Sequence, residues 1–201
     1  ISAILARSNL AGAPIYETAA ALPDDPGVWA LRQHLHSIAQ TMPQRAQHGL
    51  LRLAVARVFS LSGQGTVVTG TVFNGRVAMG DSLVHSASGK TVRVRSIHAQ
   101  NQAAENVVAG LRCALNLAGS GKDEIGRGDW MLDARMLQTT QRIDVRLHLL
   151  AGATALKPWA PVHLHLGTMR CTGHIALLQD GELAPGSEAL AQLVLDEPAA
   201  V

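Results

Sequence analysis

From about residue 50 onward, apolar and polar residues alternate in short segments separated by glycine-containing turns. Alternation with a period of two predicts β-strands that have one face in a core. The expected strands of a first set are residues 51–59, 66–73, 90–97, 111–117 and 130–132, with Gly-Asp corners at 80–81 and 128–129. Many short antiparallel strands favour a closed barrel, because closure leaves no exposed strand edge. We therefore expect a β-barrel over residues 49–135.

A second set of alternating segments begins near Gln141. The expected strands are residues 143–150, 162–166, 172–178 and 190–195, with turns at Pro158 and Pro185-Gly186. This pattern predicts a second antiparallel β-barrel over residues 139–201. No segment of it is recognisable as a closing strand, so the second barrel is expected to be partial or open.

The first 45 residues have a different pattern. Apolar residues have helical spacing in 1–10 and again in 28–40, and a short apolar stretch between them, 13–21, is expected to form a strand. A helix, a strand and a helix are too few to make a domain, so residues 1–45 are interpreted as the remnant of an α/β domain. Because the chain starts without Met, we expect it to begin within a longer protein. The fold class is therefore mainly β, with two consecutive antiparallel barrels after this remnant.

Composition limits the classes of partner. The formal net charge is only +2, far below that of a dedicated nucleic-acid binder, and aromatic residues make up 3%. Few aromatics disfavour a surface that stacks bases, so any nucleic-acid contact is expected to use phosphate. No apolar run reaches the length of about 20 residues that a membrane helix needs. The two cysteines form no CxxC pair, which favours a reduced, cytoplasmic location without contact to a membrane.

Several motifs that suggest chemistry have simpler explanations. His163 and His165 lie on one face of an expected strand, but no third ligand accompanies them, so no metal site is expected. Gly63-x-Gly65 precedes a strand rather than a helix and is interpreted as a hairpin turn. Cys113 is expected to face the core. The G-x-x-x-x-G-K-[ST] phosphate loop does not occur in the sequence, so this chain is not expected to hydrolyse GTP and no catalytic residue is assigned.

Residues 52–59, 63–72 and 77–81 resemble the second domain of translational GTPases, which elongation factor Tu and relatives of initiation factors share. Residues 92–102 (VRVRSIHAQNQ), 109–119 (AGLRCALNLAG) and 124–130 (EIGRGDW) are similar to bacterial selenocysteine-specific elongation factors. The resemblance implies that 1–45 is the end of the GTPase domain, 49–135 is domain II, which binds the aminoacyl end, and 139–201 is a truncated domain III that would contact the arms of the tRNA.

The resemblance also implies a function for the parent protein. That protein would bind selenocysteinyl-tRNA and deliver it, with GTP and Mg²⁺ as cofactors, to the ribosome at UGA codons. It would recognise the selenocysteine-insertion hairpin of the mRNA through winged-helix domains absent from this chain, and this chain itself would hold no cofactor. Two alternatives remain open: the tRNA-binding barrels of another translational GTPase, and a β-barrel interaction module without a tRNA role.

Residues of an aminoacyl pocket are also implied by the resemblance. In this family an Asp-Arg pair on the first strand and an Arg on a later strand line the pocket, and here the arginines fall on Arg57 and Arg112 while Ala56 replaces the Asp. A selenol is ionised at neutral pH whereas a serine hydroxyl is not, so two permanent charges would select the selenolate. A single strand arginine is, however, most often a solvated side chain.

Two further sets of residues are weaker candidates. Arg93 and Arg95 could contact tRNA phosphate, although the outward polar face of a barrel strand explains them more simply. Thr18 and Ala19 occupy the place of the last guanine-recognition loop in the family, and as a free motif they carry little weight.

Overall fold

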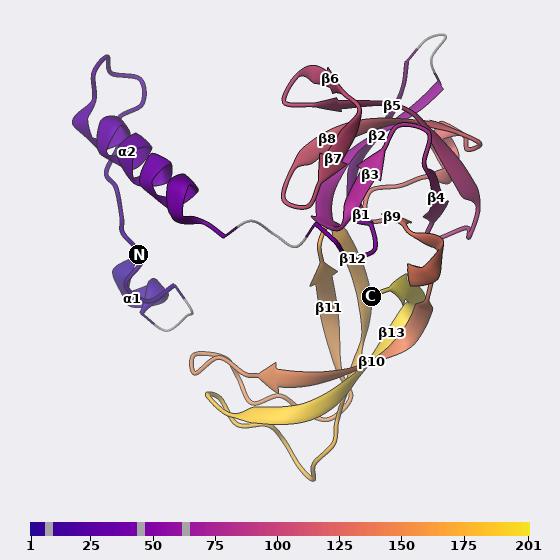
Figure 1. Cartoon of the computed structure of the whole chain (residues 1–201). Helices are drawn as coiled ribbons and strands as arrows, with labels where there is room; N and C mark the ends of the chain where they lie inside the picture. The colour runs from indigo at the N-terminus through magenta and orange to yellow at the C-terminus, as the bar shows by residue number, and fades with distance from the viewer. Residues whose placement is uncertain (7–9, 44–46, 62–64) are drawn as a thin grey trace. The chain divides into compact units, whose positions relative to one another are not determined.

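A computed structural model describes residues 1–6, 10–43, 47–61 and 65–201 (Figure 1). The chain divides into two compact units, Ile1–Gln44 and Arg45–Val201. The expected turn at Gly63 and parts of the first helix and of the linker fall outside the described residues. No helix among the described residues is long and apolar enough to cross a membrane.

The described residues of the first unit form a single helical turn, α1 (Ser2–Leu5), and one regular helix, α2 (Pro26–Thr41). The expected helix at 28–40 is confirmed and begins earlier, because Pro26 occupies its first turn and the Asp25 carboxylate accepts a 2.8 Å hydrogen bond from the Val28 amide. The expected strand at 13–21 is wrong: described residues 10–25 contain no strand. The described residues of this unit include no neighbouring strand that could supply ladder hydrogen bonds to the stretch.

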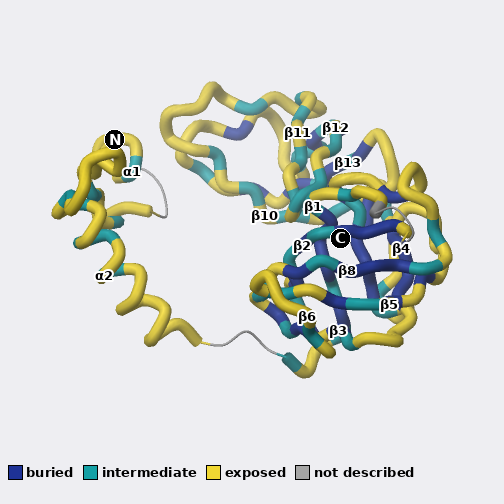
Figure 2. Tube along the Cα trace, turned by 90° about the horizontal axis from the view of Figure 1, so that it is seen from above, coloured by how far each residue is buried: buried dark blue, intermediate teal, exposed yellow. Residues whose placement is uncertain are grey.

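The first barrel is closed, as the sequence predicts. Its strands are β1 (Arg52–Leu61), β2 (Gly65–Asn74), β3 (Arg76–Ala78), β4 (Ser82–His85), β5 (Thr91–Ala99), β6 (Gln102–Ala104), β7 (Asn106–Val108), β8 (Arg112–Ala118) and β9 (Trp130–Leu132), with 3-10 turns at Lys122–Glu124 and Ala134–Met136. The main sheet has the order β4-β9-β1-β2-β8-β5-β6, and an additional β4–β5 pairing closes the ring. Alternate residues such as Leu53, Val68 and Leu115 fill its interior and are fully buried (Figure 2). The sequence did not predict β3, β4, β6 and β7, whose three or four residues show no clear alternation, although it did predict the equally short β9.

The second barrel is an antiparallel sheet of four strands. These are β10 (Thr139–His148), β11 (Ala160–Leu166), β12 (Met169–Leu177) and β13 (Glu188–Ala200), in the order β10-β13-β12-β11. Among the described residues β10 and β11 do not pair with each other, so this sheet is open, one of the two outcomes that the sequence left for it. Its apolar face includes Ile175, Ala191 and Leu195.

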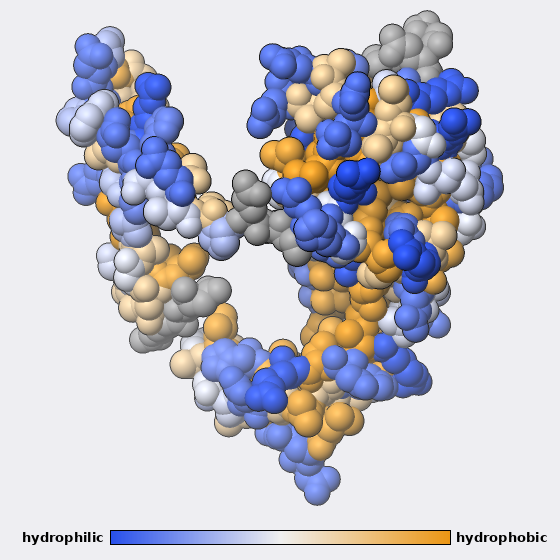
Figure 3. Space-filling model, viewed as in Figure 1, coloured by the Kyte–Doolittle hydropathy of each residue, from blue (hydrophilic) through white to orange (hydrophobic). Residues whose placement is uncertain are grey.

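The two barrels pack against each other within the second unit. A small cluster joins Ala54, Trp130 and Leu132 of the first barrel to Leu166 and Ala200 of the second. A hydrophobic strip of surface runs from this junction along β11 and β12 (Figure 3). The arrangement places the turn between β11 and β12 beside strand β1.

Candidate functional site

One row of residues crosses four neighbouring strands on the outer face of the first barrel. Arg57 of β1 lies opposite Thr69 of β2, Thr69 lies opposite Ala114 of β8, and Ala114 lies opposite His98 of β5. Side chains directly opposite each other in antiparallel strands share a face and lie about 5 Å apart. The register alone therefore gathers an arginine, a hydroxyl and an imidazole around the small side chain of Ala114.

A cavity of about 330 Å³ lies over this row. Its described lining residues are Arg57, Phe59, Thr69, His98, Gln100, Asn101, Arg112, Cys113 and Ala114. Arg112 belongs to the same face because it lies two residues before Ala114 on β8. The fold thus brings together Arg57 and Arg112, which are 55 positions apart in the sequence and which the family resemblance selected.

The direction of the Arg57 side chain depends on a β-bulge. Val55 lies opposite Gly70 and Arg57 lies opposite Thr69, so Ala56 is an extra residue on β1. Bulges change the direction in which the following side chain points, and they occur often beside functional sites. A Cβ on Gly70 would lie 2.2 Å from the carbonyl oxygen of Ala54, so only glycine allows this close approach of the strands.

The charges of the cavity favour an anion. Both guanidiniums are permanently charged, and no acidic residue is among its described lining residues. Neither Arg57 nor Arg112 forms an ion pair with any described residue. The cavity therefore carries two unneutralised positive charges beside hydrogen-bond donors.

Thr69 is one of the lining residues that the sequence did not suggest. Its Oγ1 is buried and has no hydrogen-bond partner among the described residues. A buried hydroxyl without a partner is costly, so this oxygen is available to bond a ligand or a water molecule in the cavity. Thr69 could be identified only from its position opposite Arg57 in the paired strands. That pairing cannot be derived from the sequence unless the bulge at Ala56 is already known.

The rim of the cavity includes the tight turn between β5 and β6. Gln100 and Asn101 have left-handed backbone angles, with φ of 51° and 65°. Asparagine tolerates this conformation better than most residues. The turn directs this polar pair to the edge of the cavity, next to His98.

Other candidates from the sequence lie outside this cavity. Arg93 and Arg95 are exposed on β5, and neither lines it. Thr18 and Ala19 are exposed in the first unit, in a segment without helix or strand. Among the described residues, no group of three or more His, Cys, Asp or Glu could hold a metal ion, and this includes the surroundings of His163 and His165.

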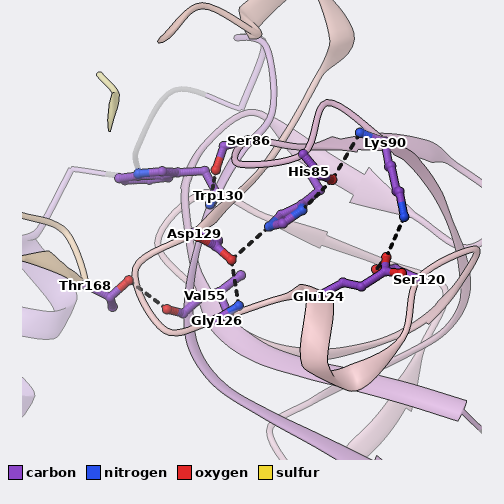
Figure 4. A network of polar contacts seen from close by, with 11 residues as sticks. Val55, His85, Ser86, Lys90, Ser120, Glu124, Gly126, Asp129, Trp130 and Thr168 are labelled. Atoms are coloured by element: carbon purple, nitrogen blue, oxygen red, sulfur yellow. Dashed lines mark hydrogen bonds and ion pairs between the residues drawn. The ribbon is translucent and has the colours of Figure 1, made fainter. Parts of the chain in front are cut away.

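A buried polar network supports the strand that carries Arg57 (Figure 4). The His85 ring is 1% exposed, and its Nε2 contacts the Asp129 carboxylate at 2.8 Å while its Nδ1 contacts the Ser88 hydroxyl at 2.8 Å. Burial raises the pKa of Asp129, but hydrogen bonds from His85 and the Gly126 amide outweigh it and the pKa lies below its ordinary value. The network fixes the segment 126–129, whose backbone bonds to Val55.

Comparisons with known proteins agree with this architecture. Residues 65–132 match the family model of elongation factor Tu domain 2, and residues 140–201 match the β-barrel domain of the selenocysteine-specific elongation factor. The chain is also 38% identical to the selenocysteine-specific elongation factor of Escherichia coli (strain K12) over 98% of its own length. This chain belongs to the selenocysteine-specific elongation factors. The resemblance of residues 92–102, 109–119 and 124–130 is thereby confirmed.

Other selenocysteine-specific elongation factors give the same result. The factor of Haemophilus influenzae (strain ATCC 51907 / DSM 11121 / KW20 / Rd) is 38% identical over 86% of this chain. The chain spans 30% of the length of the E. coli relative and 27% of the H. influenzae relative. The apo form of translation elongation factor SelB from Methanococcus maripaludis has a TM-score of 0.84 at 23% identity, covering 100% of this chain and 47% of its own. At that identity the likeness shows a shared fold.

Proposed function

We propose that the cavity over Arg57, Thr69, Ala114 and His98 holds the aminoacyl end of selenocysteinyl-tRNA. The observation that carries this proposal is the convergence of Arg57 and Arg112 on one cavity without a described acidic residue in its lining. Membership of the selenocysteine-specific elongation factors supports the choice of ligand. The parent protein would deliver this tRNA to the ribosome at UGA codons in a reaction that depends on GTP.

Selection in this proposal works by charge. At neutral pH a selenocysteinyl group carries a selenolate, whereas a seryl group carries a neutral hydroxyl of similar shape. Two guanidiniums that line one cavity attract the anion and gain nothing from the neutral hydroxyl. Ala56 provides no carboxylate to offset Arg57, so the charge offered to the ligand is larger than in a cavity with an Asp-Arg pair.

The remaining assignments belong to the same proposal. Residues 1–45 would be the end of the GTPase domain, 49–135 domain II and 139–201 domain III, with Thr18 and Ala19 near the guanine base. Arg93 and Arg95 would contact tRNA phosphate. GTP, Mg²⁺ and the mRNA hairpin would bind to other parts of a cytoplasmic parent protein, and no catalytic residue is assigned to this chain.

The test is the tRNA preference of the full-length protein. Equilibrium affinities for selenocysteinyl-, cysteinyl- and seryl-tRNA would be measured for the wild type and for Arg57→Ala, Arg112→Ala and the double variant. Arg76→Ala is the matched control, since it removes the same charge from an exposed position of the same barrel outside the cavity. We expect the double variant to lose most of its preference for selenocysteinyl-tRNA while the control keeps it. An unchanged preference in the double variant would refute the proposal.

A further inference from the structure

The carbonyl oxygen of Val55 accepts two hydrogen bonds from outside its own strand ladder. The Gly128 amide donates one at 3.1 Å, and the Thr168 hydroxyl donates the other at 2.7 Å. Gly128 belongs to the first barrel, whereas Thr168 lies in the turn between β11 and β12 of the second. Figure 4 shows the Thr168 hydroxyl directed at the Val55 carbonyl. The Val55 amide in turn donates to the carbonyl oxygen of Asp129 at 2.9 Å. Both polar groups of this residue are therefore hydrogen-bonded, and the bond from Thr168 crosses between the barrels.

Val55 is the last residue before the bulge that carries Arg57. Its carbonyl oxygen belongs to the planar peptide unit that joins it to Ala56. Fixing that oxygen fixes the orientation of the peptide with which the bulge begins, and the bulge determines the direction of Arg57. The Thr168 hydroxyl of the second barrel thus holds the Val55–Ala56 peptide, which immediately precedes the cavity residue Arg57 of the first barrel.

Two glycines hold the donor turn against the first barrel. Gly167 has φ +60°, and a Cβ on it would lie 3.0 Å from the Trp130 ring. Gly128 has φ +104°, and a Cβ on it would lie 3.1 Å from the Cα of Met169. Trp130 is 2% exposed, so the surface against which the turn packs is itself fixed. Packing rather than chance therefore places the Thr168 hydroxyl at Val55.

We propose that Thr168 is a positioning residue for the aminoacyl cavity. Its hydroxyl bond to Val55 holds the bulge in the conformation that directs Arg57 toward the cavity it shares with Arg112. This inference rests on the proposed function of that cavity. It goes further by making the docking of the second barrel a determinant of selenocysteinyl discrimination, although no atom of Thr168 lines the cavity.

The experiment compares three variants of the full-length protein. Thr168→Val removes the hydroxyl and keeps the shape, and Thr168→Ser keeps the hydroxyl. Thr172→Val is the matched control, because it makes the same change on β12, where the hydroxyl bonds to the exposed Asp196 instead. The first readout is the ratio of affinities for selenocysteinyl- and seryl-tRNA. The second is hydrogen exchange of peptides that cover residues 52–60, and thermal unfolding is recorded for each variant.

We expect Thr168→Val to lower the affinity ratio by about fivefold, the factor of one net hydrogen bond, and to speed exchange at the bulge. Thr168→Ser and Thr172→Val should keep the affinity ratio and the exchange rate at residues 52–60 at wild-type values. If Thr168 had only a structural role, Thr168→Val would lower the unfolding temperature and reduce the affinities for both tRNAs equally. The affinity ratio would then be unchanged, and that result would overturn the proposal. Unchanged exchange at residues 52–60 would overturn it as well. A further outcome is that Thr168→Val changes hydrogen exchange while the wild-type protein shows no preference between the two tRNAs. In that case the proposed function of the cavity is wrong, and so is the role of Thr168 in discrimination.

Discussion

The hydroxyl of Thr168 in the second barrel donates a 2.7 Å hydrogen bond to the carbonyl oxygen of Val55 in the first. Val55 lies two residues before Arg57, and Arg57 lies opposite Thr69. The residue bonded by the second barrel and the residue that lies opposite the unpartnered Thr69 hydroxyl are therefore only two positions apart on β1.

The unpartnered hydroxyl of Thr69 should affect stability and binding in opposite directions. An unsatisfied buried hydroxyl costs about 1–3 kcal/mol, so Thr69→Val should raise or maintain the free energy of unfolding in urea. If the hydroxyl bonds the aminoacyl group, the same variant should bind selenocysteinyl-tRNA several-fold more weakly. Thr69→Ser restores the hydroxyl and should restore the affinity. Equal affinity of the Val and Ser variants would show that the hydroxyl does not contact the ligand.

The close approach at Gly70 should make this position intolerant of any side chain. Gly70→Ala would place a Cβ 2.2 Å from the Ala54 carbonyl oxygen and 2.8 Å from the Leu53 side chain. The resulting strain should lower the free energy of unfolding by about 1–3 kcal/mol, measured by chemical denaturation. Gly121→Ala serves as the control, since its Cβ would meet nothing closer than Glu124 Cγ at 3.9 Å. Equal stabilities of the two variants would contradict the strand geometry described here.

The long strands were predictable from sequence, and the site was predictable only in part. Alternation identified the region of β1, β2, β5 and β8, because each has enough residues to show a period of two. The strand expected at 13–21 was wrong, because an apolar stretch forms a strand only with a partner. Arg57 and Arg112 were selected by resemblance alone. The bulge at Ala56 leaves no local pattern, so the contribution of Thr69 and the bond from Thr168 required the folded register.

The two cysteines should differ sharply in reactivity. Cys113 is buried in the core, and burial raises the pKa of its thiol to about 12. Cys171 is only half-buried, although burial and the nearby Asp196 and Glu197 also raise its pKa. A thiol reagent at pH 8 should therefore label Cys171 slowly and Cys113 only after unfolding, because the thiolate is the reacting species. Cys171→Ser should abolish labelling of the native chain, and rapid labelling of two thiols would contradict the burial of Cys113.

The His85–Asp129 pair should give the protein an acid-dependent stability. The pKa of Asp129 in the folded state lies below its ordinary value of 3.8. For such a group the folded state binds fewer protons than the unfolded state, so its contribution is complete above the ordinary pKa and is lost as the pH falls through the folded pKa. Asp129→Asn keeps the shape and removes the charge, so it should be less stable at neutral pH by about 1–3 kcal/mol and should lose less stability on acidification.

The measurement is urea denaturation of the wild type and Asp129→Asn at a series of pH values from neutral to below the ordinary aspartate pKa. Asp133, whose pKa the hydrogen bond from Arg135 lowers to about 2, titrates in both proteins and cancels in the comparison. The two curves of unfolding free energy against pH should therefore converge as the pH falls. Protonation of Asp129 removes its negative charge from the wild type, and the substitution has already removed that charge from the variant. Parallel curves would mean that the carboxylate contributes no charge-dependent stability, and His85 would then hold the segment 126–129 through its shape alone.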